Sequence, residues 1–230
     1  MKSQRFGASR VLFIMNRLLA VILLFTTSAL AANNEERVLN EIAEHQQLIR
    51  NSANAFGISP RLVASVIYAE RFLNYNLEDD WLDGLFAESG YNSSVGFAQI
   101  KVTTAFWIEK EIHNPNSLYY LGDDVKSKFP RSTSRPELIH RLFNDSINIL
   151  YCCAYAAMIE QRWEKAPTGF STGAFLSDRN KTGIIATLYS LGTIRFDGTE
   201  RIPHSNPQMS HFGKTAQRFY DGFVLRMEFP

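Results

Sequence analysis

Cysteine is scarce in this chain of 230 residues, and its two cysteines, Cys152 and Cys153, are neighbours. Two thiols joined through one peptide bond form a disulfide only with strong distortion, and two are too few for a disulfide scaffold or a structural zinc site. They occur in the apolar stretch "NILYCCAYAAMI", where cysteine behaves as a small hydrophobe. We therefore expect both cysteines to be buried in a helix, without a redox role.

Metal ligands and excess charge are also missing. The five histidines are scattered without the spacing of metal ligands, and we expect neither a metal site nor a cofactor. The chain has 24 basic and 23 acidic side chains, with no clustered positive charge. Nucleic-acid binders carry such clusters, so we expect no nucleic-acid partner.

The first 31 residues differ from the rest, because they hold four basic side chains and no acidic one. The apolar run "LLAVILLF" (18–25) and the small residues Ala29 and Ala31 complete the signature of a secretory signal peptide. Removal of residues 1–31 would leave residues 32–230, with 20 bases against 23 acids, as a periplasmic or secreted protein. The alternative is a membrane anchor formed by residues 11–25, although this run is short of the roughly 20 apolar residues of a spanning helix.

The spacing of apolar residues predicts a mainly α domain over residues 32–230. Gly57 should end the first helix, and Ser59 and Pro60 should begin the next one. Segment 75–95 is expected to be a loop or a few short helical turns, and segment 113–136 a surface connection. Helices are expected over residues 34–56, 60–74, 183–192 and 211–227. Segment 96–112 is expected to be a turn that leads into a helix. Segment 137–165 is expected to hold two helices that meet near Asn144.

Glu70 interrupts the apolar side of the helix "LVASVIYAERFLN" (62–74). Positions three and four residues away carry Ile67, Val66, Leu73 and Asn74, so the carboxyl projects from the apolar face. Burial raises the pKa of such a carboxyl. A carboxyl that stays protonated near neutral pH can protonate a leaving glycosidic oxygen. The alternative is a structural Glu that is paired with Arg71 or with a capping amide.

A second candidate segment is "SSVGFAQIKVTTA" (93–105). Gly96 permits close approach of the backbone to a ligand, and Gln99 offers an amide donor and a carbonyl acceptor for sugar hydroxyl and N-acetyl groups. Alone, this G-x-x-Q pattern is a weak signal, and its order after the Glu70 helix matters more.

Four motifs in order resemble the lysozyme-like lytic transglycosylases of bacterial cell-wall metabolism. "FGISPRLVASVIYAERFLN" is similar to the helix that ends in the catalytic Glu of this family, and "VGFAQIKVTTA" resembles its "GLMQ" segment. "LFNDSINILYCCAYAAMIEQRW" resembles the stretch around an Asn-Ile pair, and "ATLYSLG" resembles the "AYNAG" segment. The motifs span roughly residues 56 to 192, and the resemblance implies a single lysozyme-like domain with a substrate cleft.

The resemblance implies a peptidoglycan lytic transglycosylase that acts through one carboxyl, Glu70, as acid and then base. Tyr189 would stabilise the transition state. Gly96, Phe97, Gln99 and Ser190 would bind substrate. Peptidoglycan glycan strands would be the partner of a monomeric enzyme, with envelope protein complexes as a further possibility.

Three substitutions depart from the family pattern. Arg71 stands in place of Ser, Ala98 in place of Met, and Ser190 in place of Asn. The segment between Glu70 and Gly96 is also longer than usual by roughly ten residues.

Alternatives stay open for several of these residues. Glu88 in "AESGYN" is a rival acid, but it lacks a preceding amphipathic helix. Tyr189, Gln99 and Phe97 can also be read as core or turn residues, and Asn148 is expected to be structural.

Two other activities compete with the lytic one. A hydrolytic muramidase would need a second carboxylate, which the acidic loop after the Glu70 helix can supply through Glu78, Asp79, Asp80 or Asp83. A non-catalytic peptidoglycan-binding or scaffold protein is the third reading, motivated by the substitutions at Arg71 and Ser190.

Overall fold

The computed structural model divides into two units, residues 1–41 and 42–230. The second unit holds the elements that carry the candidate site. Residues 34–44 form a helix. The expected signal peptide lies outside the described residues. The structure describes residues 34–74, 92–164, 176, 179–204, 206–222 and 228–229.

Helices dominate the described part of the second unit, which confirms the mainly α prediction. The helices are α2 (Gln46–Ala55), α3 (Pro60–Leu73), α5 (Val102–Ile112), α6 (Asp123–Lys128), α7 (Arg135–Leu142), α8 (Asp145–Glu164), α9 (Lys181–Leu191) and α10 (His211–Asp221). A two-stranded antiparallel hairpin joins β1 (Ser94–Val95) to β2 (Ile100–Lys101).

The start of α3 forms as the sequence predicts. Gly57 follows α2 with a φ of 66°, a left-handed conformation that glycine adopts without steric cost. The Ser59 side chain accepts a hydrogen bond from the backbone N–H of Leu62, and Pro60 is the first helical residue. The prediction of one helix over 34–56 was wrong in one detail, because a turn at His45 divides it.

Helices α7 and α8 meet near Asn144, as expected, and are bent by 100° relative to one another. The Asn144 side chain accepts a hydrogen bond from the backbone N–H of Ile147 at 3.2 Å, which begins α8. Among the described residues, no single helix is long and apolar enough to cross a bilayer, and only the bent pair α7–α8 meets that test jointly.

Two segments differ from their predictions. The turn expected before α5 is a short hairpin, because Val95 pairs with Ile100 and Ser94 with Lys101. The connection 113–136 contains the short helix α6. Most of the loop predicted over 75–95 lies outside the described residues.

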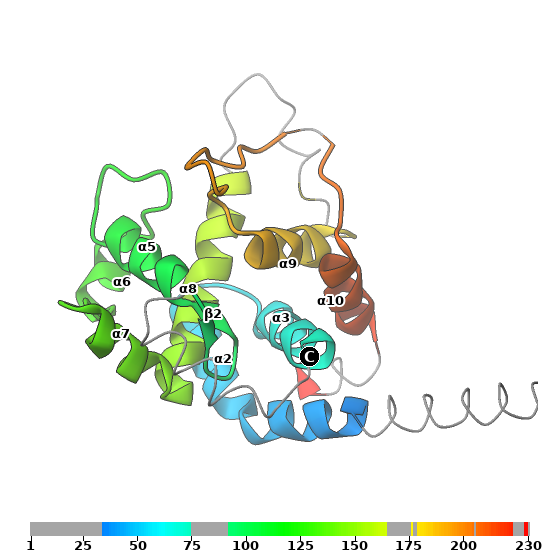
Figure 1. Cartoon of the computed structure of the whole chain (residues 1–230). Helices are drawn as coiled ribbons and strands as arrows, with labels where there is room; N and C mark the ends of the chain where they lie inside the picture. Colours follow the sequence, from blue (N-terminus) through cyan, green and yellow to red (C-terminus); the bar gives the residue numbers. More distant parts are fainter. Residues whose placement is uncertain are drawn as a thin grey trace, which may run out of the picture. The chain divides into compact units, whose positions relative to one another are not determined.

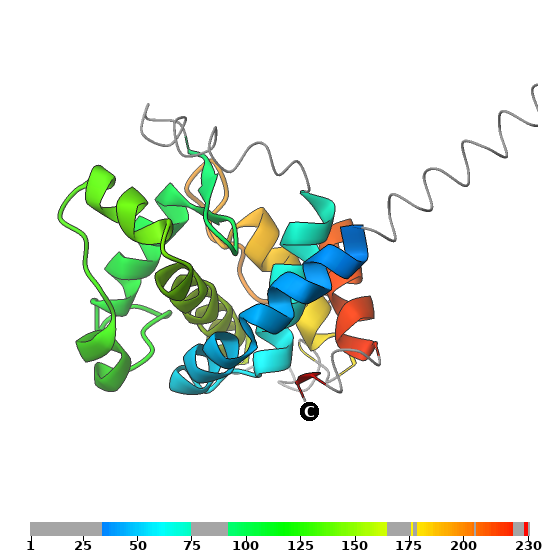
Figure 2. The ribbon, with the colours of Figure 1, turned by 90° about the horizontal axis from the view of Figure 1, so that it is seen from below.

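Helix α8 forms the core of the second unit. It contacts α2, α3, α5, α7 and α9; α5, α6 and α7 lie on one side of it, and α3, α9 and α10 on the other (Figures 1 and 2). Cys152 and Cys153 are fully buried in its middle, as predicted. Because the middle of α8 is covered around most of its circumference, residues 149–159 carry no charged or amide side chain.

Helix α10 closes the core beside α3 and α9. The rings of Tyr68 and Phe219 stack at 3.4 Å between centroids. A Cβ on Gly213 would lie 2.2 Å from the Gly183 carbonyl, so α9 and α10 approach this closely only because glycine stands there. Helix α9 is thereby held against α8 and α3, where it faces the candidate site.

Candidate active site

Glu70 lies in the last turn of α3, where its side chain is only 6% exposed. Burial raises the pKa of this carboxyl to about 7, because the protein cannot solvate the charge as water does. Two neighbours act in the opposite direction and favour the carboxylate: the amide of Asn74, which donates to Glu70 Oε2, and the positive charge of Lys101. Glu70 is therefore poised to exchange its proton near neutral pH.

The β1–β2 hairpin supplies the facing wall of the site. Its turn contains two residues with positive φ, Gly96 at 76° and Gln99 at 51°. The backbone N–H of Gln99 donates to the Gly96 carbonyl at 2.9 Å, and its side-chain amide donates to the same carbonyl at 3.1 Å. These bonds hold Gln99 in a conformation that non-glycine residues seldom adopt.

Asn148 on α8 holds this turn in place through hydrogen bonds, in the structural role expected from the sequence. Its side chain is fully buried, donates to the carbonyls of Val95 at 2.7 Å and Leu142 at 2.9 Å, and accepts from the N–H of Ala98 at 2.7 Å. A Cβ on Gly96 would lie 2.3 Å from Asn148 Nδ2. Gly96 is therefore required for the close approach of hairpin and helix.

Tyr189 connects α9 to the same turn. Its buried hydroxyl donates to the Ala98 carbonyl at 2.8 Å, and the Cys152 thiol lies within hydrogen-bonding reach of it. Burial raises the pKa of Tyr189 well above its usual value, and the electrostatic influence of Cys152 and Glu70 acts in the same direction. The Tyr189 hydroxyl therefore stays neutral at any physiological pH.

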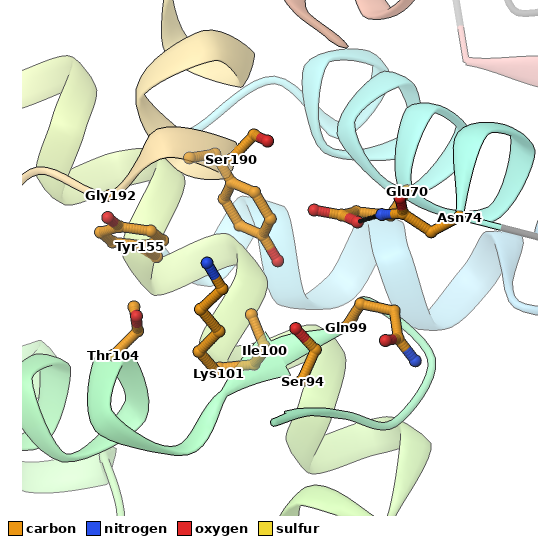
Figure 3. A pocket seen from close by; sticks show the side chains of 11 residues that line it. Glu70, Asn74, Ser94, Gln99, Ile100, Lys101, Thr104, Tyr155, Ser190 and Gly192 are labelled. Carbon is orange, nitrogen blue, oxygen red and sulfur yellow. Dashed lines mark hydrogen bonds between the residues drawn. The ribbon is translucent and has the colours of Figure 1, made fainter. Parts of the chain in front are cut away.

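These elements enclose a pocket of about 250 Å³, which we call the Glu70 pocket. Glu70 and Asn74 project into it from α3, Lys101 rises from the facing hairpin, and Ser190 and Gly192 close it at the end of α9 (Figure 3). The lining residues are Glu70, Asn74, Ser94, Gln99, Ile100, Lys101, Thr104, Tyr155, Tyr189, Ser190 and Gly192.

Four of the six predicted site residues thus line one pocket: Glu70, Gln99, Tyr189 and Ser190. The other two, Gly96 and Phe97, do not. Gly96 packs against Asn148. Phe97 is buried and stacks on the ring of His45 at 4.2 Å between centroids. The geometry therefore does not support the prediction that Gly96 and Phe97 bind substrate. Both residues instead support the turn that presents Gln99.

Sequence reasoning did not assign several of the lining residues. Asn74 was within reach, because it lies four residues after Glu70 on the same helix face. Lys101 follows Gln99 by two residues, but an exposed lysine carries no specific signal. Tyr155 comes from the middle of α8, where it reads as one more core aromatic, and only the fold brings it to the pocket.

No group of three or more His, Cys, Asp or Glu side chains suited to a metal ion occurs among the described residues. The rival acid Glu88 and the loop acids Glu78, Asp79, Asp80 and Asp83 lie outside the described residues.

No protein-family model matches the chain, and no curated protein matches it significantly. Its function is therefore inferred from the site itself and from the order of its motifs.

Proposed function

We propose that the protein is a peptidoglycan lytic transglycosylase that cleaves the β-1,4 bond between N-acetylmuramic acid and N-acetylglucosamine. The observation that carries the proposal is Glu70, a carboxyl with a pKa raised to about 7 by burial at the edge of an accessible pocket. A general acid works best when its pKa lies near the working pH. The order of helix, G-x-x-Q turn and α9 motif supports a lysozyme-like arrangement as part of the same proposal.

In the first step, the protonated Glu70 carboxyl gives its proton to the glycosidic oxygen as the bond from that oxygen to C1 of the muramyl residue breaks. Positive charge develops at C1 in the oxocarbenium-like transition state. The Tyr189 hydroxyl donates a hydrogen bond to the Ala98 carbonyl, so the lone pairs of its oxygen can face this charge.

In the second step, the Glu70 carboxylate accepts the proton of the muramyl 6-hydroxyl, whose oxygen attacks C1 and forms the 1,6-anhydro ring. Asn74 and Lys101 favour the carboxylate that exists between the two steps. Glu70 ends protonated again, so the cycle needs neither water nor a cofactor.

The pocket lining favours this route over hydrolysis. A hydrolytic muramidase would need a second carboxylate to position water or to act as nucleophile. Among the described residues that line the pocket, Glu70 is the single acid, and its other neighbours are amides, hydroxyls, aromatic rings and one lysine.

The activity is tested by incubating purified peptidoglycan with the protein and determining the masses of the soluble products. Anhydromuropeptides, which are lighter by one water than their hydrolytic counterparts, are the expected result. Reducing-end muropeptides would identify a muramidase instead. Binding to peptidoglycan without soluble products would identify a non-catalytic binding protein.

The site of action follows from the substrate. We propose that the protein acts on peptidoglycan in the periplasm or outside the cell, as a monomer, after removal of residues 1–31. N-terminal sequencing of the exported protein tests the leader, because an intact N-terminus after export would support the anchor formed by residues 11–25.

A further inference from the structure

A second pocket, of about 240 Å³, lies on the other face of α9. Tyr189 lines the Glu70 pocket, whereas Ile184, Leu188 and Leu191 line the second one. Residues three, four and seven positions apart share one face of a helix. One helix therefore separates the two pockets, and we call the second one the α9 pocket.

Consecutive residues at the end of this helix line the two pockets. Leu191 borders the α9 pocket, and the next residue, Gly192, borders the Glu70 pocket. Arg201 lines the α9 pocket, and its Nε donates to the Gly192 carbonyl at 2.9 Å. Figure 1 shows the orange segment after α9 that carries Arg201 before the chain enters α10.

The α9 pocket carries positive charge. Arg195 and Arg201 line it, and no acidic side chain is among its described lining residues. One guanidinium nitrogen of Arg195 donates to the Glu200 carbonyl at 2.7 Å and to the Thr199 hydroxyl at 3.2 Å. Asp197, between Arg195 and Thr199 in the sequence, directs its carboxylate to the N–H and hydroxyl of Thr199 and also interacts electrostatically with Arg195. Both arginines thus retain donors for an anionic ligand.

A buried donor marks the inner wall of the α9 pocket. Trp163 on α8 lines the pocket and is only 2% exposed, and its indole Nε1 has no hydrogen-bond partner among the described residues. Buried polar groups in folded proteins are nearly always paired. His204 packs on the indole edge-to-face at 5.6 Å between ring centroids, so the pocket also offers an aromatic wall.

The rim of the pocket is apolar and uncovered. Leu191 is 52% exposed and Ile202 is 60% exposed. Ile184 and Leu188 continue this surface inward. The combination of apolar surfaces and two guanidinium groups fits a short peptide that has methyl side chains and free carboxylates.

We propose that the α9 pocket binds the peptide that branches from the muramyl residue of the glycan strand held in the Glu70 pocket. This peptide is a short chain with alanine methyl groups and several free carboxylates. The assignment rests on the proposed function, because it names a further part of the same substrate.

The dimensions allow one substrate to occupy both pockets. A helix with its side chains is about 10–12 Å wide, and a peptide of four residues spans about 13 Å when it is extended. The branch can therefore pass over the end of α9 at Gly192 while its glycan remains beside Glu70. Its carboxylates then reach Arg195 and Arg201.

The proposal is tested by titrating the ¹⁵N-labelled full chain with the free tetrapeptide L-Ala-γ-D-Glu-diaminopimelate-D-Ala. The chain has three tryptophans, so Trp163→Phe identifies the indole N–H signal of Trp163. We expect this signal to shift and saturate as the peptide is added. A signal that does not move at about 10 mM peptide, where even millimolar affinity would saturate the site, overturns the proposal.

Three variants test whether the pocket recognises charge. Arg195→Gln, which keeps a donor but removes the charge, should weaken binding about tenfold, and Arg195→Lys should restore most of it. Phe196→Ser is the matched control, because Phe196 follows Arg195 in the sequence, is fully exposed and does not line the pocket. Equal affinity of wild type and Arg195→Gln would overturn carboxylate recognition.

Cleavage rates separate this proposal from the proposed function. Arg195→Gln should slow cleavage of peptide-bearing strands about tenfold and leave cleavage of strands stripped of peptide by an amidase unchanged. Equal slowing of both substrates would overturn the role of the α9 pocket and leave the lytic activity standing. Saturable peptide binding by a protein that cleaves neither substrate would support the α9 pocket as a peptide site and overturn the proposed lytic activity.

Discussion

Glu70 and Glu109 are two buried glutamates on helices of the same unit, with exposed fractions of 6% and 3%. Their surroundings differ in the number of donors. Glu109 on α5 accepts from the Ser132 N–H at 2.7 Å, from the Ser132 hydroxyl at 2.8 Å and from the Tyr151 hydroxyl. Among the described residues, Asn74 is the single side-chain donor to the Glu70 carboxyl.

The comparison shows that two carboxyls of similar burial differ in their hydrogen-bond donors and in their access to a pocket. Both oxygens of Glu109 are occupied by donors that tie α5 to α8 and to the segment before α7, so its role is structural. Glu70 combines burial with incomplete pairing and with access to a pocket. A buried carboxyl that lacks full compensation has a raised pKa and can exchange a proton with a ligand.

The largest expected difference between the two residues is in activity. Glu70→Gln should reduce the release of soluble anhydromuropeptides from peptidoglycan by about 1,000-fold or more, because the amide cannot transfer the proton. Glu109→Gln is the matched control, and once folded it should retain activity within about tenfold of wild type. Equal losses of activity in the two variants would contradict a special role of Glu70. An active Glu70→Gln variant would indicate that another acid, such as Glu88, transfers the proton.

The next effect is a pH dependence of stability that the raised pKa of Glu70 should produce. Below pH 4.5, the ordinary value for this carboxyl, Glu70 is protonated in both the folded and the unfolded state. As the pH rises from 4.5 to about 7, only the unfolded state ionises, and the free energy of unfolding falls; above about pH 7 the loss is complete. The total is about 3 kcal/mol.

Urea unfolding at pH 4 and pH 8 measures this dependence. Glu70→Gln should match wild type at pH 4 and exceed its free energy of unfolding by up to about 3 kcal/mol at pH 8. A wild-type protein that is no less stable than the variant at pH 8 would show that other groups compensate the buried charge of Glu70.

Glu109 should give the opposite result. Glu109→Gln replaces an acceptor-only group by one that turns two N–H donors toward Ser132 and Tyr151, and it should lower the free energy of unfolding by about 2 kcal/mol. Thermal and urea unfolding at pH 7 measure the loss. An unchanged stability would mean that the three hydrogen bonds contribute little, and the contrast with Glu70 would then rest on pocket access alone.

The smallest effect concerns Lys101, whose charge favours the Glu70 carboxylate from an exposed position. Lys101→Met should raise the pKa of Glu70 further, so the alkaline limb of the pH–activity profile should move to slightly higher pH. Lys101→Arg keeps the charge and should leave the limb in place. A shift toward lower pH would contradict the assignment of Glu70 as the group that titrates.

Local sequence signals predicted the helical part of the site well. The apolar spacing of α3, its start at Ser59 and Pro60, and the burial of Glu70 all depend on neighbours within about four residues. The break near Asn144 and the burial of both cysteines depend on equally short-range patterns.

The rest of the site depends on contacts between distant segments. Asn148 reaches Ala98 across 50 residues, and Tyr189 reaches it across 91. These contacts decide that Gln99 lines the pocket whereas Phe97 packs against His45. No local period encodes them, so the same residue types read equally well as core, turn or ligand contacts.

The sequence by itself therefore determined the longer helices and that one of them buries an ionisable group, because both follow from periodicity along the chain, whereas the short helix α6 was missed. Only the tertiary structure decided that Glu70 lies beside a pocket whereas Glu109 is enclosed by donors. The reason is physical: the pKa and reactivity of a carboxyl are set by the groups packed around it, and helix packing brings these groups from distant parts of the chain.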